Sequence, residues 1–317
     1  MAVWIIFILF ILLFLALDLG VFNKKAHVIK TKEAAIWTSV WISIAMGFSG
    51  VIWWLFSDEL VANPTGLTPG SAVIKYITGY LVELSLSIDN VFVIAVIFRS
   101  FAIPDLYQHR ILFWGILGAL VFRALMIIFG VALITKFDWI VYVFGVFLLY
   151  TAFKMLKSNN APINPRNSVV IKKLRNVLPF TSIIEGERFF IRRMGKRFAT
   201  PLFLALVMIE FTDILFALDS IPAILAITVD PFIVFSSNIL AILGLRSMYF
   251  LISNMLNRFR YIHYSLVVIL AYVGVKLIFS HHVEIPEWLS LAVIALFLAV
   301  GIISSMMITD RNAEEKV

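Results

Sequence analysis

Long apolar stretches alternate with short polar segments along the whole chain. Most are about twenty residues long, the length that a helix needs to cross roughly 30 Å of hydrocarbon. The pattern therefore predicts an all-α membrane protein with about nine transmembrane helices. The predicted spans cover residues 3–22, 34–56, 70–98, 108–134, 139–156, 200–228, 232–254, 262–280 and 286–308. The third and sixth spans are too long for straight helices that only cross the membrane.

Composition supports a membrane protein and argues against a soluble fold. Of the 317 residues, 62% are hydrophobic and 14% are charged, and the mean hydropathy is +1.01. Soluble domains are close to half apolar. The first apolar run has no basic segment before it and no small-residue cleavage site, so we expect a retained anchor and not a signal peptide. The chain has no cysteine, which excludes disulfides and thiolate metal ligands.

Basic residues mark one side of the predicted membrane. The formal charge is +7, but the Lys and Arg residues lie mainly in the odd-numbered connections, whereas connections such as 57–69 and 229–231 have none. By the positive-inside rule this pattern places the N-terminus outside and the C-terminus in the cytoplasm. The basic residues are therefore expected to face lipid headgroups, and nucleic acid is not an expected partner.

The largest basic cluster lies between spans five and six and divides the chain. This connection, residues 157–199, starts with an Asn- and Pro-rich segment and then carries eight Lys and Arg residues between positions 172 and 197. Residues 188–198 could form a small hairpin around Gly195 and Lys196, and a lipid-bound strand or disorder is equally compatible. The expected organisation is 1–69 for the first two spans, 70–156 for a three-helix unit, 157–199 for the basic loop, 200–280 for a second three-helix unit, and 281–317 for the last span and tail.

The two three-helix units look like a duplication. Each contains two acids six residues apart, the second followed by a small polar residue: Glu83 and Asp89-Asn90 in one, Asp213 and Asp219-Ser220 in the other. Arg123 and Arg246 then follow in matching sequence contexts. Because each unit has an odd number of spans, the second would enter the membrane from the opposite side, as in the inverted repeats of many secondary transporters.

Several acids fall inside the predicted spans. A charge at the centre of a membrane helix costs about 3 kcal/mol on insertion scales, so such acids must be balanced. One explanation is structural pairing with Arg123 and Arg246, helped by Lys75 and Lys276; Lys154 is expected to reach the cytoplasmic surface instead. That explanation leaves a surplus of acids, which predicts a site for a cation or for protons. The acids concerned are Glu83, Asp89, Glu210, Asp213 and Asp219.

The donors available at these positions predict a hard cation. At 100° per residue, Glu83 and Asp89 lie about 120° apart on a helix, so one straight helix cannot bring them together. Pro222 should break its helix near Asp219 and expose carbonyl oxygens, with Asn90 as a weaker breaker in the first unit. Carboxylate, amide, hydroxyl and carbonyl oxygens suit magnesium, calcium or manganese.

Two further possibilities remain open at this point. Buried carboxylates can exchange a metal ion for protons, so transport could be coupled to a proton gradient. A weak outer metal site could also form on the external side, from His281, His282, Glu284 and Glu287.

The two acidic motifs also carry a family resemblance. The segments Glu83-Leu-Ser-Leu-Ser-Ile-Asp89-Asn90-Val-Phe and Phe211-Thr-Asp213-Ile-Leu-Phe-Ala-Leu-Asp219-Ser220-Ile-Pro222 resemble those of the TerC family, and the nine-span plan is similar to its Alx-type members. The resemblance implies export of manganese across the bacterial inner membrane. It places Glu83, Asp89, Asn90, Asp213, Asp219 and Ser220 at the metal, and Glu210 lies just before the second motif.

These observations lead to a transporter and to defined alternatives. We expect no catalytic residues and no prosthetic group, with Mn²⁺ as the transported ion. A calcium transporter would use the same oxygen donors. A membrane scaffold, or a redox or tellurite-resistance component without transport, would not need the intramembrane acids. The oligomeric state cannot be inferred from these patterns.

Overall fold

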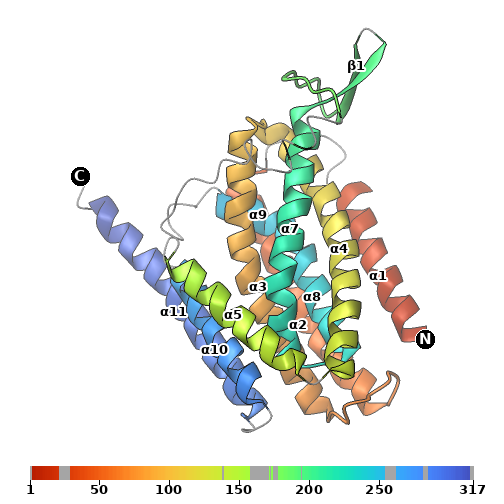
Figure 1. Cartoon of the computed structure of the whole chain (residues 1–317), viewed down its shortest axis with the longest axis vertical. Helices are drawn as coiled ribbons and strands as arrows, with labels where there is room; N and C mark the ends of the chain where they lie inside the picture. Colours follow the sequence, from red (N-terminus) through yellow and green to blue (C-terminus); the bar gives the residue numbers. More distant parts are fainter. Residues whose placement is uncertain are drawn as a thin grey trace.

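The computed structural model is a bundle of α-helices with one small β-hairpin (Figure 1). It describes residues 2–20, 29–137, 139–157, 171, 173, 178–193, 195–253, 262–280 and 285–314, without side-chain detail for 17–20, 262–263 and 306–314. The helices are α1 (Ala2–Gly20), α2 (Thr31–Ser57), α3 (Pro69–Ser100), α4 (Asp105–Lys136), α5 (Ile140–Lys157), α7 (Pro201–Leu225), α8 (Pro231–Leu243), α9 (Leu245–Ser253), α10 (Ile262–Phe279) and α11 (Glu287–Glu314).

Proline and capping residues set the start of several helices. The Thr68 side chain accepts a hydrogen bond from the Ser71 amide (3.2 Å) before Pro69 begins α3. Asp230 accepts hydrogen bonds from two amides of the first turn of α8, each 3.0 Å long. Proline at the first helical position loses no intrahelical bond, and a capping oxygen satisfies amides that have no helical partner. These ends are thus fixed by local sequence.

Among the described residues, six helices are long and apolar enough to cross a membrane: α2, α3, α4, α5, α7 and α11. A seventh span results if α8 and α9, which meet at a 43° bend, are taken together. The helices α1 and α10 are apolar but have shorter apolar stretches. The prediction of an all-helical membrane protein is confirmed. The count of nine spans and the inverted duplication stay predictions.

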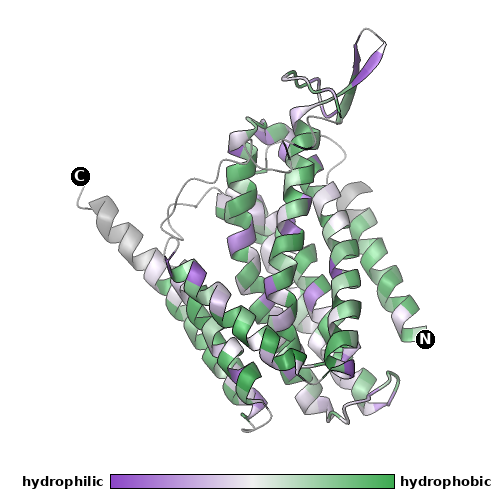
Figure 2. Cartoon of the chain, in the orientation of Figure 1, coloured by the Kyte–Doolittle hydropathy of each residue, from purple (hydrophilic) through white to green (hydrophobic). Residues whose placement is uncertain are grey.

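Helices α3 and α7 lie side by side in the centre of the molecule, while α5, α10 and α11 form a tilted group beside them (Figure 1). Apolar residues predominate along the helices (Figure 2), and many of them, such as Ile128 and Phe129, are exposed. Within the tilted group, α5 and α10 approach closely at Gly145 and Gly274, where a Cβ on Gly145 would stand 3.0 Å from the Gly274 carbonyl oxygen. Small residues permit such close contact between membrane helices.

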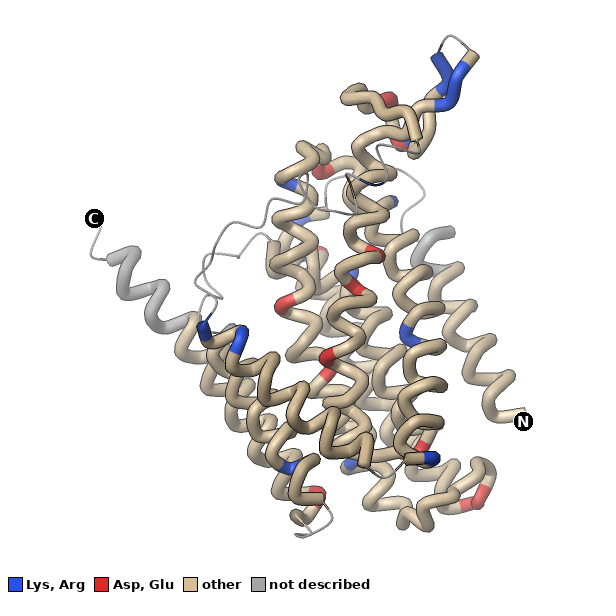
Figure 3. The backbone as a smooth tube through the Cα atoms, in the orientation of Figure 1, with Lys and Arg blue, Asp and Glu red and all other residues tan. Residues whose placement is uncertain are grey.

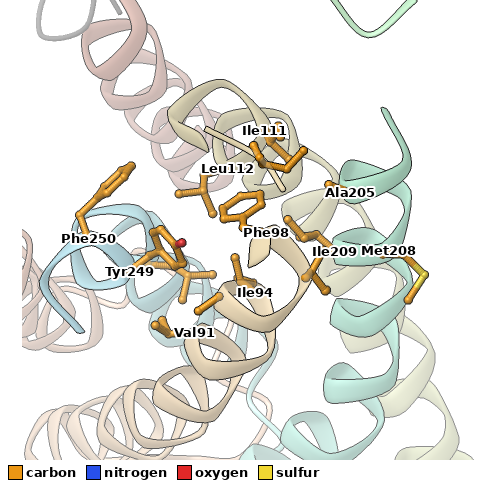
Figure 4. Packing of buried hydrophobic residues seen from close by; sticks show 14 of the residues in the cluster. Val91, Ile94, Phe98, Ile111, Leu112, Ala205, Met208, Ile209, Tyr249 and Phe250 are labelled. Atoms are coloured by element: carbon orange, nitrogen blue, oxygen red, sulfur yellow. The ribbon is translucent and has the colours of Figure 1, made fainter. Parts of the chain in front are cut away.

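A large apolar cluster joins α3, α4, α7 and α9 (Figure 4). Phe98 of α3 packs edge-to-face against Tyr249 of α9, with ring centroids 5.5 Å apart. The Tyr249 hydroxyl donates a 3.0 Å hydrogen bond to Gln108 Oε1, so its polar end is satisfied inside the cluster. This packing fixes the relative rotation of the central helices, and with it the direction in which their acidic residues point.

The predicted helix breaks are not present. Helix α7 continues through Pro222 to Leu225, and α3 continues through Asn90 to Ser100. Pro222 has no amide hydrogen to donate to the Leu218 carbonyl, so one helical hydrogen bond is lost. Pro222 lies in the last turn of α7, where the Ala226 amide still donates to the Pro222 carbonyl (3.0 Å). Losing a single bond so near a helix end does not interrupt the helix.

Of the alternatives that the sequence left open for the basic loop, the structure has a hairpin. Strands β1 (Phe190–Arg193) and β2 (Lys196–Ala199) pair antiparallel. Gly195, which follows β1, has φ +76°, a conformation that glycine adopts without strain.

Candidate functional site

The seven predicted site residues lie on the two central helices, Glu83, Asp89 and Asn90 on α3 and the others on α7. Charged residues are few inside the bundle, and acids mark the central helices (Figure 3). The seven side chains divide into two main groups, with Glu210 set apart. The helices bring together the first acids of the two motifs in one group and the second acids in the other.

The first group is a buried charge network around Arg123 of α4. Glu83 and Arg123 form an ion pair in which each side chain is 1% exposed. Arg123 Nη2 lies 3.7 Å from Asp213 Oδ1. Asn238 of α8 completes the network, because Arg123 donates to its Oδ1 (2.8 Å) and its Nδ2 donates to Glu83 (3.1 Å). Four helices are thus connected through one guanidinium.

The network does not fully balance its charges. Two carboxylates face one guanidinium, and Asp213 Oδ2 is buried without a hydrogen-bond partner among the described residues. The same holds for Arg123 Nε. A polar atom that is buried without a partner is costly unless a water or an ion satisfies it. The predicted structural pairing is therefore confirmed for Arg123, and an acidic surplus remains beside it.

The second group lines a cavity of about 520 Å³ between α3, α5, α7 and α10. Asp89 and Asn90 enter it from α3, and Asp219 and Ser220 enter it from α7. The rest of the wall is largely apolar and includes Leu215 and Leu270. Two carboxylates, an amide and a hydroxyl therefore share one cavity in otherwise apolar surroundings.

Helix α5 contributes two polar residues to this cavity. The Thr151 hydroxyl donates a 2.9 Å hydrogen bond to Asp219 Oδ1. Lys154, one turn further along α5, lines the same cavity. Its positive charge attracts the Asp219 carboxylate, whereas the Asp89 carboxylate repels that of Asp219. We expected Lys154 to extend away to the cytoplasmic surface, but although its side chain is exposed, it also borders the cavity.

Ser220 and Asn90 connect the two groups. Ser220 accepts a 3.1 Å hydrogen bond from Arg123 and also lines the larger cavity. Asn90 lines that cavity and a second pocket of about 20 Å³ beside Asp213, which has room for about one water molecule. The Asn90 Nδ2 atom is buried without a partner among the described residues. Ser220 thus contacts the charge network directly, and Asn90 borders a pocket that Asp213 also lines.

Glu210 does not join either group directly. Its carboxylate lies against the backbone of Gly118 on α4, where any Cβ would overlap it. Asp213, one turn away on α7, repels it electrostatically, and its Oε2 atom is buried without a partner in the described part of the chain.

The expectation of one site holding all seven residues is not met. Within the described ranges, no group of three or more His, Asp or Glu side chains is placed to hold one metal ion. The physical reason is the angle between the acids of each motif, since straight helices keep Glu83 and Asp89 on different faces.

The other predicted cations have separate partners. Arg246 is buried beside a small pocket that Glu33 and Trp41 also line. Lys75 pairs with Glu287 of α11 at 3.1 Å, and Lys276 donates a 2.8 Å hydrogen bond to Ser290. Of the suggested outer metal site, His281, His282 and Glu284 lie outside the described residues.

Asn238 and Thr151 were not predicted from the sequence. The polar run Ser236-Ser237-Asn238 inside an apolar span was a usable signal for the first. Thr151 gives no comparable signal, because a lone threonine in a membrane helix commonly bonds to its own backbone.

The fold and the site define a polytopic α-helical membrane protein with a charged interior. The sequence profile of the integral membrane protein TerC family matches residues 68–313. The chain belongs to this family, as the motifs around Glu83 and Asp213 indicated.

Curated relatives match nearly the full chain. An uncharacterized membrane protein of Myxococcus xanthus is 48% identical, over 98% of this chain and 93% of its own length. A protein of Salmonella typhi described as a putative membrane-bound redox modulator Alx is 41% identical, over 98% and 95%. The Escherichia coli K12 protein of the same description is 39% identical, over 99% and 97%. No solved structure matches the chain.

Proposed function

We propose that the protein is a secondary transporter that exports a hard divalent cation, Mn²⁺ in the first place, across the bacterial inner membrane. The observation that carries the proposal is the shared cavity of Asp89 and Asp219, two carboxylates from the two motifs, inside a bundle of apolar helices. Intramembrane acids that face a cavity characteristically belong to ion pathways.

The donor set suits a transported ion. Asp89 and Asp219 would provide charge, Asn90 and Ser220 would provide neutral oxygens, and water would complete the coordination. Hard divalent cations accept such oxygen ligands, and those that keep several waters are often held by only one or two carboxylates. A site with two carboxylates binds less tightly than a closed cage, which favours release on the far side.

The remaining acids take other roles in this proposal. Glu83 and Asp213 are engaged with Arg123 and hold α3, α4 and α7 together. Glu210 lies apart from the cavity lining, beside Gly118. Protons that bind to the buried carboxylates would be the counter-substrate for the exported cation. An N-terminus outside and a cytoplasmic C-terminus, as the distribution of Lys and Arg indicates, would place the hairpin on the cytoplasmic side.

The proposal is tested by Mn²⁺ transport in liposomes that contain the purified protein. Asp89→Asn and Asp219→Asn should each reduce transport at least tenfold, while Asp58→Asn, in the exposed turn after α2, should have no effect. Repeating the assay with Ca²⁺ decides the ion, and imposing a pH difference decides proton coupling. Full Mn²⁺ transport by both cavity variants would refute the proposed site. No transport of either ion by the wild type would refute the function.

A redox role is the second candidate, because several curated relatives are described as putative redox modulators. The present chain has no cysteine, so thiol chemistry would have to come from a partner. In cells that lack the protein, complementation of a redox phenotype by Asp89→Asn with no change in cell manganese would favour this candidate or a scaffold.

A further inference from the structure

The β-hairpin presents two different faces. Side chains alternate between the faces of a strand, and residues paired across an antiparallel ladder share a face. The register pairs Phe190 with Ala199 and Arg192 with Arg197, so these four lie on one face. The pair of Arg193 and Lys196 lies on the other.

Two arginines therefore stand directly opposite each other on the first face. Like charges in this arrangement destabilise a hairpin. Neither Arg192 nor Arg197 has an acidic partner within 4 Å among the described residues. On the second face, by contrast, Arg193 pairs with Glu185 at 3.2 Å. The first face thus has two arginines without an acidic partner, whereas on the second face, in the described part of the chain, this holds only for Lys196.

The four residues of this face also line a groove. Its volume is about 460 Å³, and the rest of its lining is Leu178 and Ile191, which alternates to the other face of the strand. Phe190 is 45% exposed and packs against Phe203 of α7, with ring centroids 4.5 Å apart. The groove accordingly has two guanidiniums at one end and an apolar floor that continues to the first turn of a membrane helix.

The groove lies close to the membrane surface. Ala199 is two residues before Pro201, the first residue of α7, and two extended residues span about 7 Å. The hairpin projects beyond this end of the bundle, and its strands carry the basic residues (Figures 1 and 3). Because lipid headgroups extend several ångströms beyond the hydrocarbon core, they are within reach of the groove.

We propose that this groove binds the headgroup of an anionic phospholipid. Arg192 and Arg197 would hold the phosphate, since two guanidiniums provide charge-assisted hydrogen bonds to its oxygens. Phe190 and Leu178 would contact the glycerol and the start of the acyl chains. The lipid would neutralise the opposed arginines and fix the base of the hairpin against α7. This site is independent of the cation cavity, and it is more specific than a general attraction of basic loops to acidic membranes.

Lipid retention on the full-length purified protein tests the proposal, measured by native mass spectrometry after exchange into phosphatidylglycerol or phosphatidylcholine. Wild type should retain phosphatidylglycerol selectively. The double variant Arg192→Ala with Arg197→Ala should retain at least tenfold less phosphatidylglycerol than the wild type. The matched control, Arg193→Ala with Lys196→Ala, removes the same charge from the opposite face and should retain the lipid.

Three results would overturn the proposal. Equal loss in both double variants would show a diffuse electrostatic attraction without a site in the groove. Equal retention of the two lipids by the wild type would show that the groove does not select an anionic headgroup. Displacement of the lipid by millimolar inorganic phosphate at constant ionic strength would show that the groove binds free phosphate and not a lipid. Circular dichroism and thermal unfolding of each variant separate these results from misfolding.

Discussion

The hydroxyl of Thr151 on α5 donates a 2.9 Å hydrogen bond to Asp219 of α7, and so connects an outer helix to the proposed cation site. One oxygen of Asp219 is thereby held in place while the side chain lines the cavity with Asp89. Hydrogen bonds to charged groups contribute about 1.5–3 kcal/mol, enough to decide the orientation of a ligand.

Thr151→Val should weaken metal binding without removing a charge. The loss of one oriented hydrogen bond should raise the Mn²⁺ concentration that gives half-maximal transport about tenfold, which corresponds to about 1.4 kcal/mol. Thr151→Ser keeps the hydroxyl and should stay within about twofold of the wild type, by the same relation. Liposome transport over a range of Mn²⁺ concentrations measures both. Identical behaviour of the Val and Ser variants would show that the bond has no part in binding.

Lys154→Gln should strengthen metal binding. The ammonium group borders the cavity of Asp89 and Asp219 and repels a divalent cation there. Its removal should lower the half-saturating Mn²⁺ concentration, and Lys154→Arg should preserve the wild-type value. Lys157→Gln, one turn further on α5 and outside the cavity lining, is the control. Weaker binding in Lys154→Gln would instead assign the lysine a role in assembling the site.

Arg123→Gln should destabilise the fold severely. It leaves Glu83 and Asp213 buried without a cation, and breaking such a pair typically costs about 3–5 kcal/mol. Combining it with Glu83→Gln removes one of the stranded charges and should recover much of the loss. Thermal unfolding in detergent measures the order of stability. If Arg123→Gln alone were as stable as the double variant, the charge network would contribute little to the stability of the fold.

Gly118→Ala should displace the Glu210 carboxylate, because the added methyl group would overlap it. The expected results are a lower unfolding temperature and slower transport. Removing the carboxylate as well, in the double variant Gly118→Ala with Glu210→Ala, should restore stability but need not restore transport. Gly47→Ala is a suitable control, since no atom of another helix lies within 4 Å of the place that its added methyl group would take. No effect of Gly118→Ala would show that Glu210 moves freely.

The sequence by itself determined the helices and the residues that carry charge. Apolar runs of spanning length predict helices regardless of their neighbours, because the hydrocarbon requires internally bonded backbone. Each predicted span corresponds to helix in the described residues, and Thr68 and Asp230 cap their helices through contacts two or three residues away. The same reasoning identified Asp89, Asp219 and Arg123 as exceptional, since charge inside a membrane must be balanced.

Only the tertiary structure decided how these residues combine. Helical periodicity gives the angle between Glu83 and Asp89 on one helix, but not which neighbouring helix each faces. Packing between distant segments directs Glu83 and Asp213 to Arg123, and Asp89 and Asp219 to the cavity that Thr151 completes. The rotation of one helix against another depends on contacts between segments far apart in the chain, which local patterns do not encode.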